Sequence, residues 1–315
     1  MKMLNSTIIR IIHMKKQKGL GKLKKYVFLY ILLLPSILLT LFFSYFPMPG
    51  LLVSFMDYDV FKGFNSPWIG LDNIKELFTM PMFLKATFNT LYISALNLAI
   101  AFPAPILFAI LLNEIRGDLF KRFVQTVSYL PHFLSWIAVI GMAHSIYSTY
   151  GIVNDLRVSI GGEGTERIMF LADQALFVPN LIILNLWKTV GWNSVIYLAA
   201  IAGIDSALYE AASIDGAGKL KQCLCVTIPC IMPTAVILFI LNIGNIFKDN
   251  FDLIYGLQNP FIDFETISTI VYKQGIAAGN YSMATAIGFV QGLIGFILVV
   301  LVNYFSKKVN DIALW

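Results

Sequence analysis

The segment of this chain that comes closest to a reaction site is DGAGKL at residues 215–220, which looks like the end of a phosphate-binding loop. The pattern G-x-x-x-x-G-K-[ST] needs a glycine at position 213 and a serine or threonine at position 220. The chain has Ser213 and Leu220 instead. The sequence also lacks HExxH, GxSxG and paired intramembrane aspartates of the protease kind. We therefore predict that the chain is not an enzyme, has no catalytic residue and binds no cofactor.

Three cysteines lie close together, but their spacing does not predict a metal site. Zinc sites favour CxxC-type pairs with a fourth ligand nearby, whereas Cys223, Cys225 and Cys230 follow the pattern C-x-C-x4-C with no histidine close by. We interpret them as reduced thiols in a cytoplasmic loop. His132 follows Pro131, where it could relay a proton, but a packed or hydrogen-bonded histidine at a helix break is the simpler interpretation.

Polar and aromatic side chains interrupt two long apolar segments. The first set is spaced i, i+3, i+7 and i+10, which places it on one helix face, and comprises Asn242, Asn245, Asp249 and Asp252. The second set comprises Asn185, Trp187, Trp192, Asn193 and Tyr197. Polar residues at membrane depth usually face a bundle interior or an aqueous cavity. Interhelical hydrogen bonds and interfacial aromatic anchoring would explain the same residues, and the sequence leaves both interpretations open.

A short segment at residues 209–233, YEAASIDGAGKLKQCLCVTIPCIMP, has a different composition. The run EAA at 210–212 combines good helix formers with small side chains, so it exposes a slim face that a partner's groove could accept. The run GAG at 216–218 then permits a sharp turn or a close backbone approach. Pro229 and Pro233 restart the chain toward the next apolar segment.

The elements that carry these residues are expected to be membrane-spanning helices. Of the 315 residues, 58% are hydrophobic and only 13% are charged, whereas a soluble domain carries about 25% charged residues. Because a span needs about 20 apolar residues, the sequence predicts an all-α, polytopic membrane protein with six transmembrane helices. The six candidates lie roughly at residues 26–47, 88–113, 123–148, 176–201, 231–256 and 283–306.

Basic residues predict how these spans are oriented. Eight of the 23 lysines and arginines lie in residues 1–25, next to an apolar run, as in a cytoplasmic flank that rests against anionic lipid. This distribution explains the net charge of +5 without nucleic acid. The run 26–46 is longer than the about 7–15 apolar residues of a signal peptide and lacks a cleavage site, so we interpret it as a retained helix.

An N-terminus in the cytoplasm places 15 basic residues inside and 6 outside, and both termini are then cytoplasmic. The expected organisation is a basic segment 1–25, a transmembrane domain 26–308 and a C-terminal tail 309–315. Extracellular loops are expected near residues 48–87, 149–175 and 257–282, and a cytoplasmic loop at 202–230. Pro67, Trp68 and Gly70 punctuate the first of these loops, which we expect to be structured.

The segment 209–233 resembles the EAA loop of ATP-binding-cassette (ABC) importer permeases. That loop has Glu-Ala-Ala, a glycine four residues after the second alanine, and a hydrophobic-x-hydrophobic-Pro closing, here Val226-Thr227-Ile228-Pro229. The whole pattern lies between the fourth and fifth expected spans, on the expected cytoplasmic side. The resemblance implies a coupling helix that docks in a cleft of an ATPase subunit. The residues that it would contribute are Glu210, Ala211, Ala212, Asp215, Gly216, Ala217, Gly218 and Pro229.

Nearly the whole chain is similar to LplB-type polysaccharide/oligosaccharide permeases of the maltose-permease-like group. The segments that carry this similarity are PWIGLDNI (67–74), FPAPILFAILLNE (102–114), KRFVQTVSYLPHFLSW (121–136), YLAAIAGID (197–205), YSMATAIG (281–288) and the terminal Leu314-Trp315. Cys223, Cys225 and Ile228 depart from the residues usual at their positions. The resemblance implies a bacterial plasma-membrane, multi-pass permease that imports a saccharide by alternating access.

The same resemblance implies the partners. They would be a second homologous permease, two ATPase subunits that bind ATP and Mg, an extracellular solute-binding lipoprotein, membrane lipid and the saccharide, with no nucleic acid. The residues expected to line the substrate path are Asn242, Asn245, Asp249, Asp252, Trp187, Trp192, Asn193 and Tyr197, because a saccharide needs hydrogen-bonding groups and aromatic faces.

Two rival functions stay open at this point. The same architecture would serve an amino acid, an osmolyte or a phosphodiester. An ion-coupled secondary transporter would show repeated halves and a buried charge pair, and Lys188 and Lys248 have no evident repeat counterpart.

Overall fold

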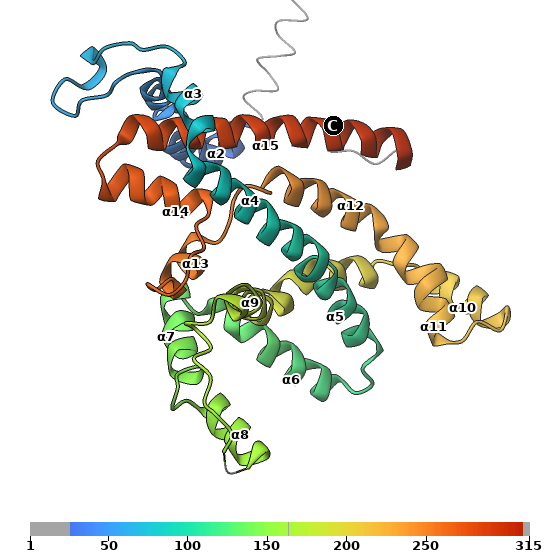
Figure 1. Cartoon of the computed structure of the whole chain (residues 1–315). Helices are drawn as coiled ribbons and strands as arrows, with labels where there is room; N and C mark the ends of the chain where they lie inside the picture. Colours follow the sequence, from blue (N-terminus) through green and yellow to red (C-terminus); the bar gives the residue numbers. More distant parts are fainter. Residues whose placement is uncertain (1–25, 163, 311–315) are drawn as a thin grey trace, which may run out of the picture. The chain divides into compact units, whose positions relative to one another are not determined.

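The computed structural model describes residues 26–162 and 164–310. In the described part of the chain nearly all regular structure is helical, and the β pairing is limited to one isolated bridge between Met56 and Trp68 (Figure 1). The predicted all-α architecture is therefore confirmed. The chain divides at Val53 into an N-terminal unit and a larger unit, here called the main unit.

The N-terminal unit contains one long apolar helix. Helix α2 (Val27–Thr40) continues through a π turn, η1 (Leu41–Tyr45), and ends in the 3-10 helix η2 (Met48–Phe55). Pro35 lies inside α2, a position that membrane helices tolerate. Together Val27–Phe55 are long and apolar enough to cross a membrane, as expected for the first span, but helical structure extends beyond the expected end at residue 47.

Four continuous helical segments of the main unit are also long and apolar enough to span a membrane. The first joins α4 (Pro81–Leu96), the π turn η4 (Asn97–Ala101) and α5 (Pro103–Glu114). The second is α9 (Gln174–Ala202), which begins where the side chain of Asp173 accepts a hydrogen bond from the Ala175 amide. The third joins α11 (Lys219–Gln222), the π turn η6 (Cys223–Thr227) and α12 (Ile228–Gly244), and the fourth is α15 (Tyr281–Asn310).

The prediction of one continuous span at residues 123–148 is wrong, because this segment is sharply bent. Helix α6 (Asp118–Tyr129) and the 3-10 turn η5 (Leu130–Phe133) end at a 103° bend, after which α7 (Trp136–Ile146) begins. Pro131 lies in η5, and the hydroxyl of Ser135 caps the first turn of α7 by accepting a hydrogen bond from the Ala138 amide. The described residues therefore hold five candidate spans, or six if this bent pair is one span.

The expected span 231–256 is also interrupted. Helix α12 ends at Gly244, and α13 (Phe251–Leu257) starts anew after a non-helical connection. The side chain of Asn250 accepts a hydrogen bond from the Leu253 amide and so caps α13. The four residues that we expected on one continuous helix face, from Asn242 to Asp252, are therefore divided between two helices and their connection.

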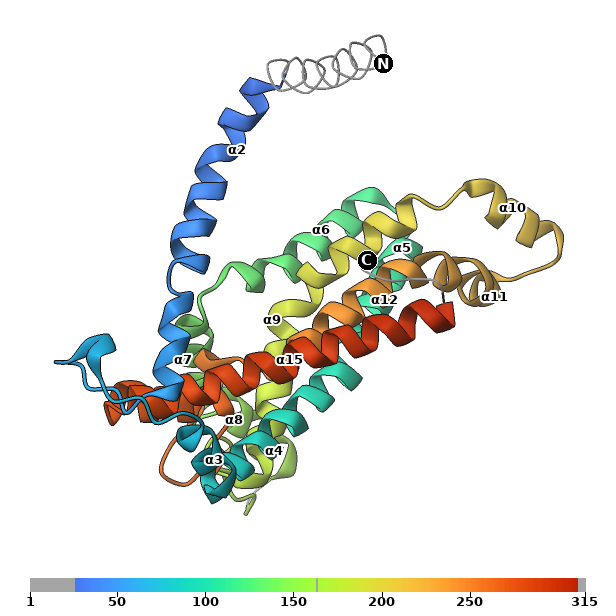
Figure 2. The same ribbon diagram turned by 90° about the horizontal axis from the view of Figure 1, so that it is seen from above.

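Three apolar clusters hold the main unit together. The first joins α7, α9 and α13 through Val139, Phe177 and Leu253, among others. The second joins α3 (Asp72–Thr79), α4, α14 (Ile267–Tyr272) and α15, and the third joins α5, α9 and α12. As a result α5 packs along α9 and α15 along α12 (Figures 1 and 2), and α5, α9 and α12 contribute to the wall of the site described below.

The connections between these helices are ordered. Between η2 and α4, the 3-10 turn η3 (Gly63–Asn65) and α3 are held by the buried side chain of Asn73, whose amide donates to the carbonyls of Ser54 and Met56. The loop expected to be structured is therefore structured. Helix α8 (Ile152–Gly161) follows α7, α10 (Ser206–Ile214) follows α9, and the π turn η7 (Lys273–Ala277) extends α14.

Candidate functional site

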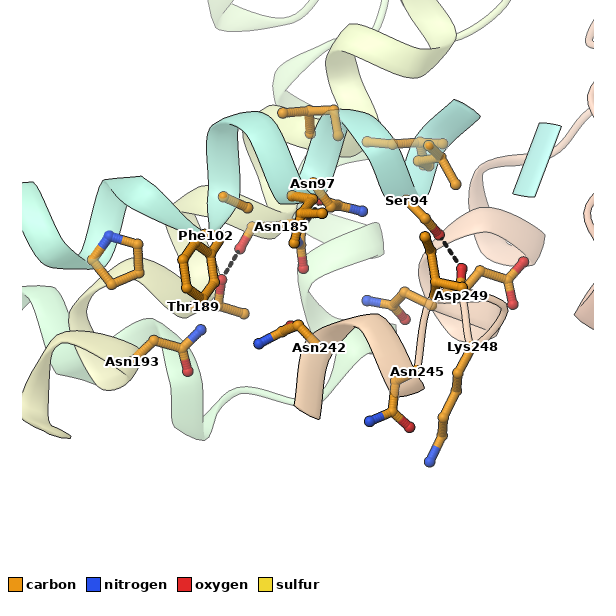
Figure 3. A pocket seen from close by; sticks show the side chains of 18 of the residues that line it. Ser94, Asn97, Phe102, Asn185, Thr189, Asn193, Asn242, Asn245, Lys248 and Asp249 are labelled. Carbon is orange, nitrogen blue, oxygen red and sulfur yellow. Dashed lines mark hydrogen bonds between the residues drawn. The ribbon is translucent and has the colours of Figure 1, made fainter. Parts of the chain in front are cut away.

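A cavity of about 600 Å³ lies between α4, η4, α5, α9, α12 and the α12–α13 connection. Apolar residues such as Phe102 and Leu181 form part of its wall, but many side chains on it are polar (Figure 3). The polar lining residues are Ser94, Asn97, Asn185, Thr189, Asn193, Tyr197, Asn242, Asn245, Lys248, Asp249 and Asn250. Its size is that of a small-molecule binding site.

One wall of the cavity is a polar stripe on α9. Asn185, Thr189 and Asn193 are spaced four residues apart, so they share a helix face. The Asn185 amide donates to the Asn97 side-chain oxygen at 3.1 Å, and the Thr189 hydroxyl donates to the Asn185 carbonyl at 2.7 Å. Asn97 opens the π turn η4, which links this wall to the α4–α5 span. Each side-chain amide has two donor hydrogens, so the Asn185–Asn97 bond leaves donors for a ligand.

The opposite wall comes from the end of α12. The side chains of Asn242 and Asn245 are exposed, and their amides donate to the carbonyls of Leu238 and Leu241, one turn earlier in the chain. The side-chain oxygens of both residues have no partner among the described residues and remain available as acceptors. The two asparagines thus line the cavity at the point where the helix ends.

The connection after α12 carries two charged residues with different surroundings. One carboxylate oxygen of Asp249 accepts a hydrogen bond from the Ser268 hydroxyl of α14, and its other oxygen is buried without a partner among the described residues. Lys248 is exposed, and no described carboxylate lies within 4.0 Å of its amine. The hydroxyl of Ser94 donates to the Ile246 carbonyl and so joins this connection to α4.

The structure brings together five of the eight residues expected on the substrate path. Four of them, Asn193, Asn242, Asn245 and Asp249, line the cavity with polar side chains. The fifth, Tyr197, also lies on the wall, but it is only 2% exposed and belongs to the cluster between α5, α9 and α12.

The other three expected path residues do not line this cavity. Asp252 is exposed on α13, because the helix break separates it from the asparagines of α12. Trp187 and Trp192 lie on other faces of α9. The Trp192 ring stacks on His132, with ring centroids 4.6 Å apart, so His132 is packed at the helix break as predicted.

Six polar residues of the cavity wall were not among the expected path residues: Ser94, Asn97, Asn185, Thr189, Lys248 and Asn250. Thr189 could have been found from its spacing of four residues to Asn185 and Asn193. Asn97 lies three residues after Ser94 and four before Ala101, which also line the cavity, so helical spacing would have found it as well.

The loop expected to couple to an ATPase folds as a helix and a tight turn. Asp205 caps α10 by accepting a hydrogen bond from the Ala207 amide, and the Tyr209 hydroxyl lies 3.0 Å from the Thr227 hydroxyl at the base of α12. After α10 the buried side chain of Gln222 donates to the Ser213 hydroxyl and the Ala217 carbonyl. The loop is therefore held in shape by its own hydrogen bonds.

The outer face of this loop is free of partners in the described chain. Glu210 and Ala211 of α10 are exposed, and Ile214 at its end is 87% exposed. Gly216 turns the chain with a backbone φ of +74°, a value that residues other than glycine rarely adopt. Both views of the main unit place α10 and α11 together at the end remote from α3 and α8 (Figures 1 and 2).

The cysteines and the other possible metal ligands were examined for groups that could hold a metal ion. Cys223, Cys225 and Cys230 are free thiols. Within residues 26–162 and 164–310, no group of three or more histidine, cysteine or acidic side chains is placed to hold a metal ion.

Comparison with known proteins identifies relatives of the whole chain. The chain is 42% identical over 301 residues to the "Polygalacturonan/rhamnogalacturonan transport system permease protein YteP" of Bacillus subtilis, an alignment that covers 94% of this chain and 93% of that protein. It is 38% identical to "Protein LplB" of the same organism, again over 94% of this chain and 93% of that protein. The predicted similarity to LplB-type permeases is confirmed.

Solved structures agree with the sequence comparison. A chain of a bacterial alginate ABC transporter, solved in complex with an alginate pentasaccharide-bound periplasmic protein, matches with a TM-score of 0.84 at 35% identity, covering 93% of this chain and 99% of that one. Residues 101–311 match the family described as "Binding-protein-dependent transport system inner membrane component". This match covers the cavity wall from α5 onward and the whole loop around α10, and the chain belongs to that family.

Proposed function

We propose that this chain is the permease subunit of an ABC importer that moves an oligosaccharide or polysaccharide fragment across the bacterial plasma membrane. The observation that carries the proposal is the cavity lined by side-chain amides and hydroxyls from α4, η4, α9 and α12. A saccharide that leaves water must exchange its hydration for such donors and acceptors. The relatives' names, which refer to polygalacturonan, rhamnogalacturonan and alginate, support a saccharide over an amino acid, osmolyte or phosphodiester.

ATP hydrolysis is proposed to come from two partner ATPase subunits, with α10 as the docking element. The exposed Glu210-Ala211 face and the exposed Ile214 offer a small, partly apolar surface for a cleft. Because Tyr209 and Gln222 tie α10 to the start of the α11–α12 span, a displacement of α10 would be passed to the cavity wall as a rigid-body movement. A second, homologous permease and an extracellular solute-binding protein complete the proposed importer.

The proposal is tested by removing single amides from the cavity. Asn242→Ala and Asn245→Ala should each slow saccharide uptake per assembled complex about tenfold, since each removes one hydrogen bond to the passing saccharide, worth about 0.5–1.5 kcal/mol. Leu241→Ala is the matched control, because Leu241 is an exposed residue of α12 that does not line the cavity. Uptake is measured in proteoliposomes beside the thermal stability of the detergent-solubilised complex.

The same assay separates a path from a structural role. If the asparagine variants lower complex yield and stability but leave uptake per complex unchanged, the polar wall only joins helices and the cavity is not the path. If the purified importer hydrolyses ATP in response to a non-sugar solute and to no saccharide, the substrate class is wrong and the importer architecture stands.

A further inference from the structure

The break at the end of α12 leaves backbone carbonyls that need hydrogen-bond donors. Helix α12 ends at Gly244, and the last carbonyls of a helix have no partner within it. The amides of Asn245, Ile246 and Lys248 bond to the carbonyls three residues earlier, at 3.0, 3.1 and 2.8 Å. The next carbonyls of the connection take their donors from other helices.

Two neighbouring carbonyls of the connection are bonded by side chains from α4 and α15. The hydroxyl of Ser94 donates to the Ile246 carbonyl, the dashed line at Ser94 in Figure 3, and the side-chain amide of Gln291 donates to the Phe247 carbonyl. The Phe247 ring is itself buried, in the cluster that contains Ile287, one turn before Gln291 on α15. Helix α15 therefore holds Phe247 both by its ring and by its carbonyl.

Helix α15 is closely packed against the end of α12. A methyl group added at Gly244 would meet the Val299 side chain at 2.4 Å, and one added at Gly295 would lie 3.1 Å from the Gly244 carbonyl. Small residues of this kind let two helix backbones approach. Gln291 lies one turn before Gly295, so it reaches the connection from a helix whose own position is fixed by packing.

We infer that Gln291 is a positioning residue of the saccharide path: it holds the α12–α13 connection so that Asn242 and Asn245 lie on the cavity wall. The inference rests on the proposed saccharide-import function and deepens it. Gln291 does not line the cavity, whereas the two asparagines do. A buried carbonyl that loses its donor is more costly than the bond it made, so without the Gln291 amide the connection would shift toward another donor. Asn245 lies only two residues before Phe247 and would move with it.

The experiment measures whether Gln291 acts through the asparagines. The importer complex is reconstituted in nanodiscs without its binding protein, and binding of trigalacturonate is followed by equilibrium dialysis. Gln291→Met keeps the length of the side chain, removes the amide and should weaken binding about fivefold, whereas Gln291→His, which retains an N–H donor, should recover part of the loss. In a complex that already carries Asn242→Ala and Asn245→Ala, Gln291→Met should change the remaining binding by less than about twofold, because residues that act as a unit are not additive.

A second readout does not depend on the saccharide. Amide hydrogen exchange of the segment 245–250 should become faster in Gln291→Met, because the connection has lost one of its ties. Thr285→Val is the matched control on α15: it removes a hydroxyl that bonds to the Tyr281 carbonyl of the same helix and does not line the cavity. It should change neither binding nor exchange of this segment.

Two results would overturn the inference. An equal loss of binding from Gln291→Met with and without the asparagines would show that Gln291 acts by another route. Lower yield of the complex, with unchanged binding per complex and unchanged exchange at 245–250, would leave Gln291 with a role in folding alone. Failure of the proposed function has a different signature, since the unmodified complex would then bind no trigalacturonate while a non-sugar solute stimulates its ATP hydrolysis.

Discussion

At the scale of single residues, the least expected feature is a buried lysine that supports a helix break. Lys188 of α9 donates from its amine to the carbonyls of His132 at 2.7 Å and Leu134 at 2.6 Å, and it lies 5.1 Å from the centre of the Trp136 ring. The end of a helix leaves carbonyl groups without intrahelical partners, and in a membrane no water is at hand to satisfy them. One ammonium group replaces the missing donors, so the bend between η5 and α7 can exist inside the bundle.

This contact gives a stability prediction. Lys188→Met should destabilise the complex by about 3 kcal/mol, because it leaves at least two buried carbonyls without a charged donor. The measurement is the thermal midpoint of the detergent-solubilised complex. Lys188→Arg should recover part of the loss, and Lys121→Met on α6 is the control. A Lys188→Met complex that melts like the unmodified one would show that other donors satisfy these carbonyls.

At the scale of elements, apolar length predicted where the helices lie and tertiary contacts decided where they break. The spans at 88–113, 176–201 and 283–306 are present because any chain that crosses the bilayer needs about 20 apolar residues. The break near Pro131 had a visible sequence signal, but the carbonyls at its 103° bend are bound by Lys188, which is more than fifty residues later in the chain. A pattern along one helix does not contain that information.

The candidate site shows the same division. The asparagines of α9 and α12 were predictable from helical spacing, since polar residues at membrane depth face an interior. Asp252 was misplaced because Asn250 starts a second helix and ends the periodicity. Asn97 shares its helix face with Ser94 and Ala101, so the same spacing would have located it. Sequence periodicity therefore locates residues only as far as the helix that carries it remains regular.

The turn after α10 depends on a glycine conformation that can be tested by substitution. Gly216 has φ +74°, a conformation that proline cannot adopt, whereas Gly218 has φ −68° and open space around it. Gly216→Pro should therefore disrupt the turn that follows the docking face and abolish substrate-stimulated ATP hydrolysis, with the permease still inserted in the membrane. Gly218→Ala is the matched control and should behave as the unmodified protein.

A second variant tests the docking face without changing the backbone. Glu210→Lys inverts an exposed charge, and like-charge contact across an interface costs several kcal/mol, so ATP hydrolysis should fall about tenfold or more. ATPase assay of the reconstituted importer, normalised to permease content, provides the readout. Normal transport by both variants would exclude this loop from the coupling mechanism.

At the scale of the whole molecule, loops that the count of basic residues places on the same side of the membrane contact one another at the ends of the main unit. Lys219 of α11 lies 3.4 Å from Glu114 at the end of α5, so two loops expected in the cytoplasm meet. At the other end, Lys85 pairs with Asp263, and the Asn259 side chain donates to the Leu171 carbonyl at 2.7 Å. These contacts join the three loops expected outside. The contacts thus join loops that the charge count assigns to one side, while the placement of 15 basic residues in the cytoplasm stays a prediction.

The last prediction tests that orientation directly. Two exposed apolar residues at opposite ends serve as matched reporters: Ile160 of α8 is 87% exposed, and Leu220 of α11 is 77% exposed. Gly161 itself is unsuitable, because a side chain there would meet Thr165 at 2.4 Å. Cys225 and Cys230 are exposed, so all three native cysteines are first changed to serine to remove background labelling. In intact cells a membrane-impermeant maleimide should then label Ile160→Cys and not Leu220→Cys, whereas both should react after the cells are opened. Labelling of Leu220→Cys from outside would place α10 on the wrong side for an ATPase and would end the coupling proposal, because the nucleotide is available only in the cytoplasm.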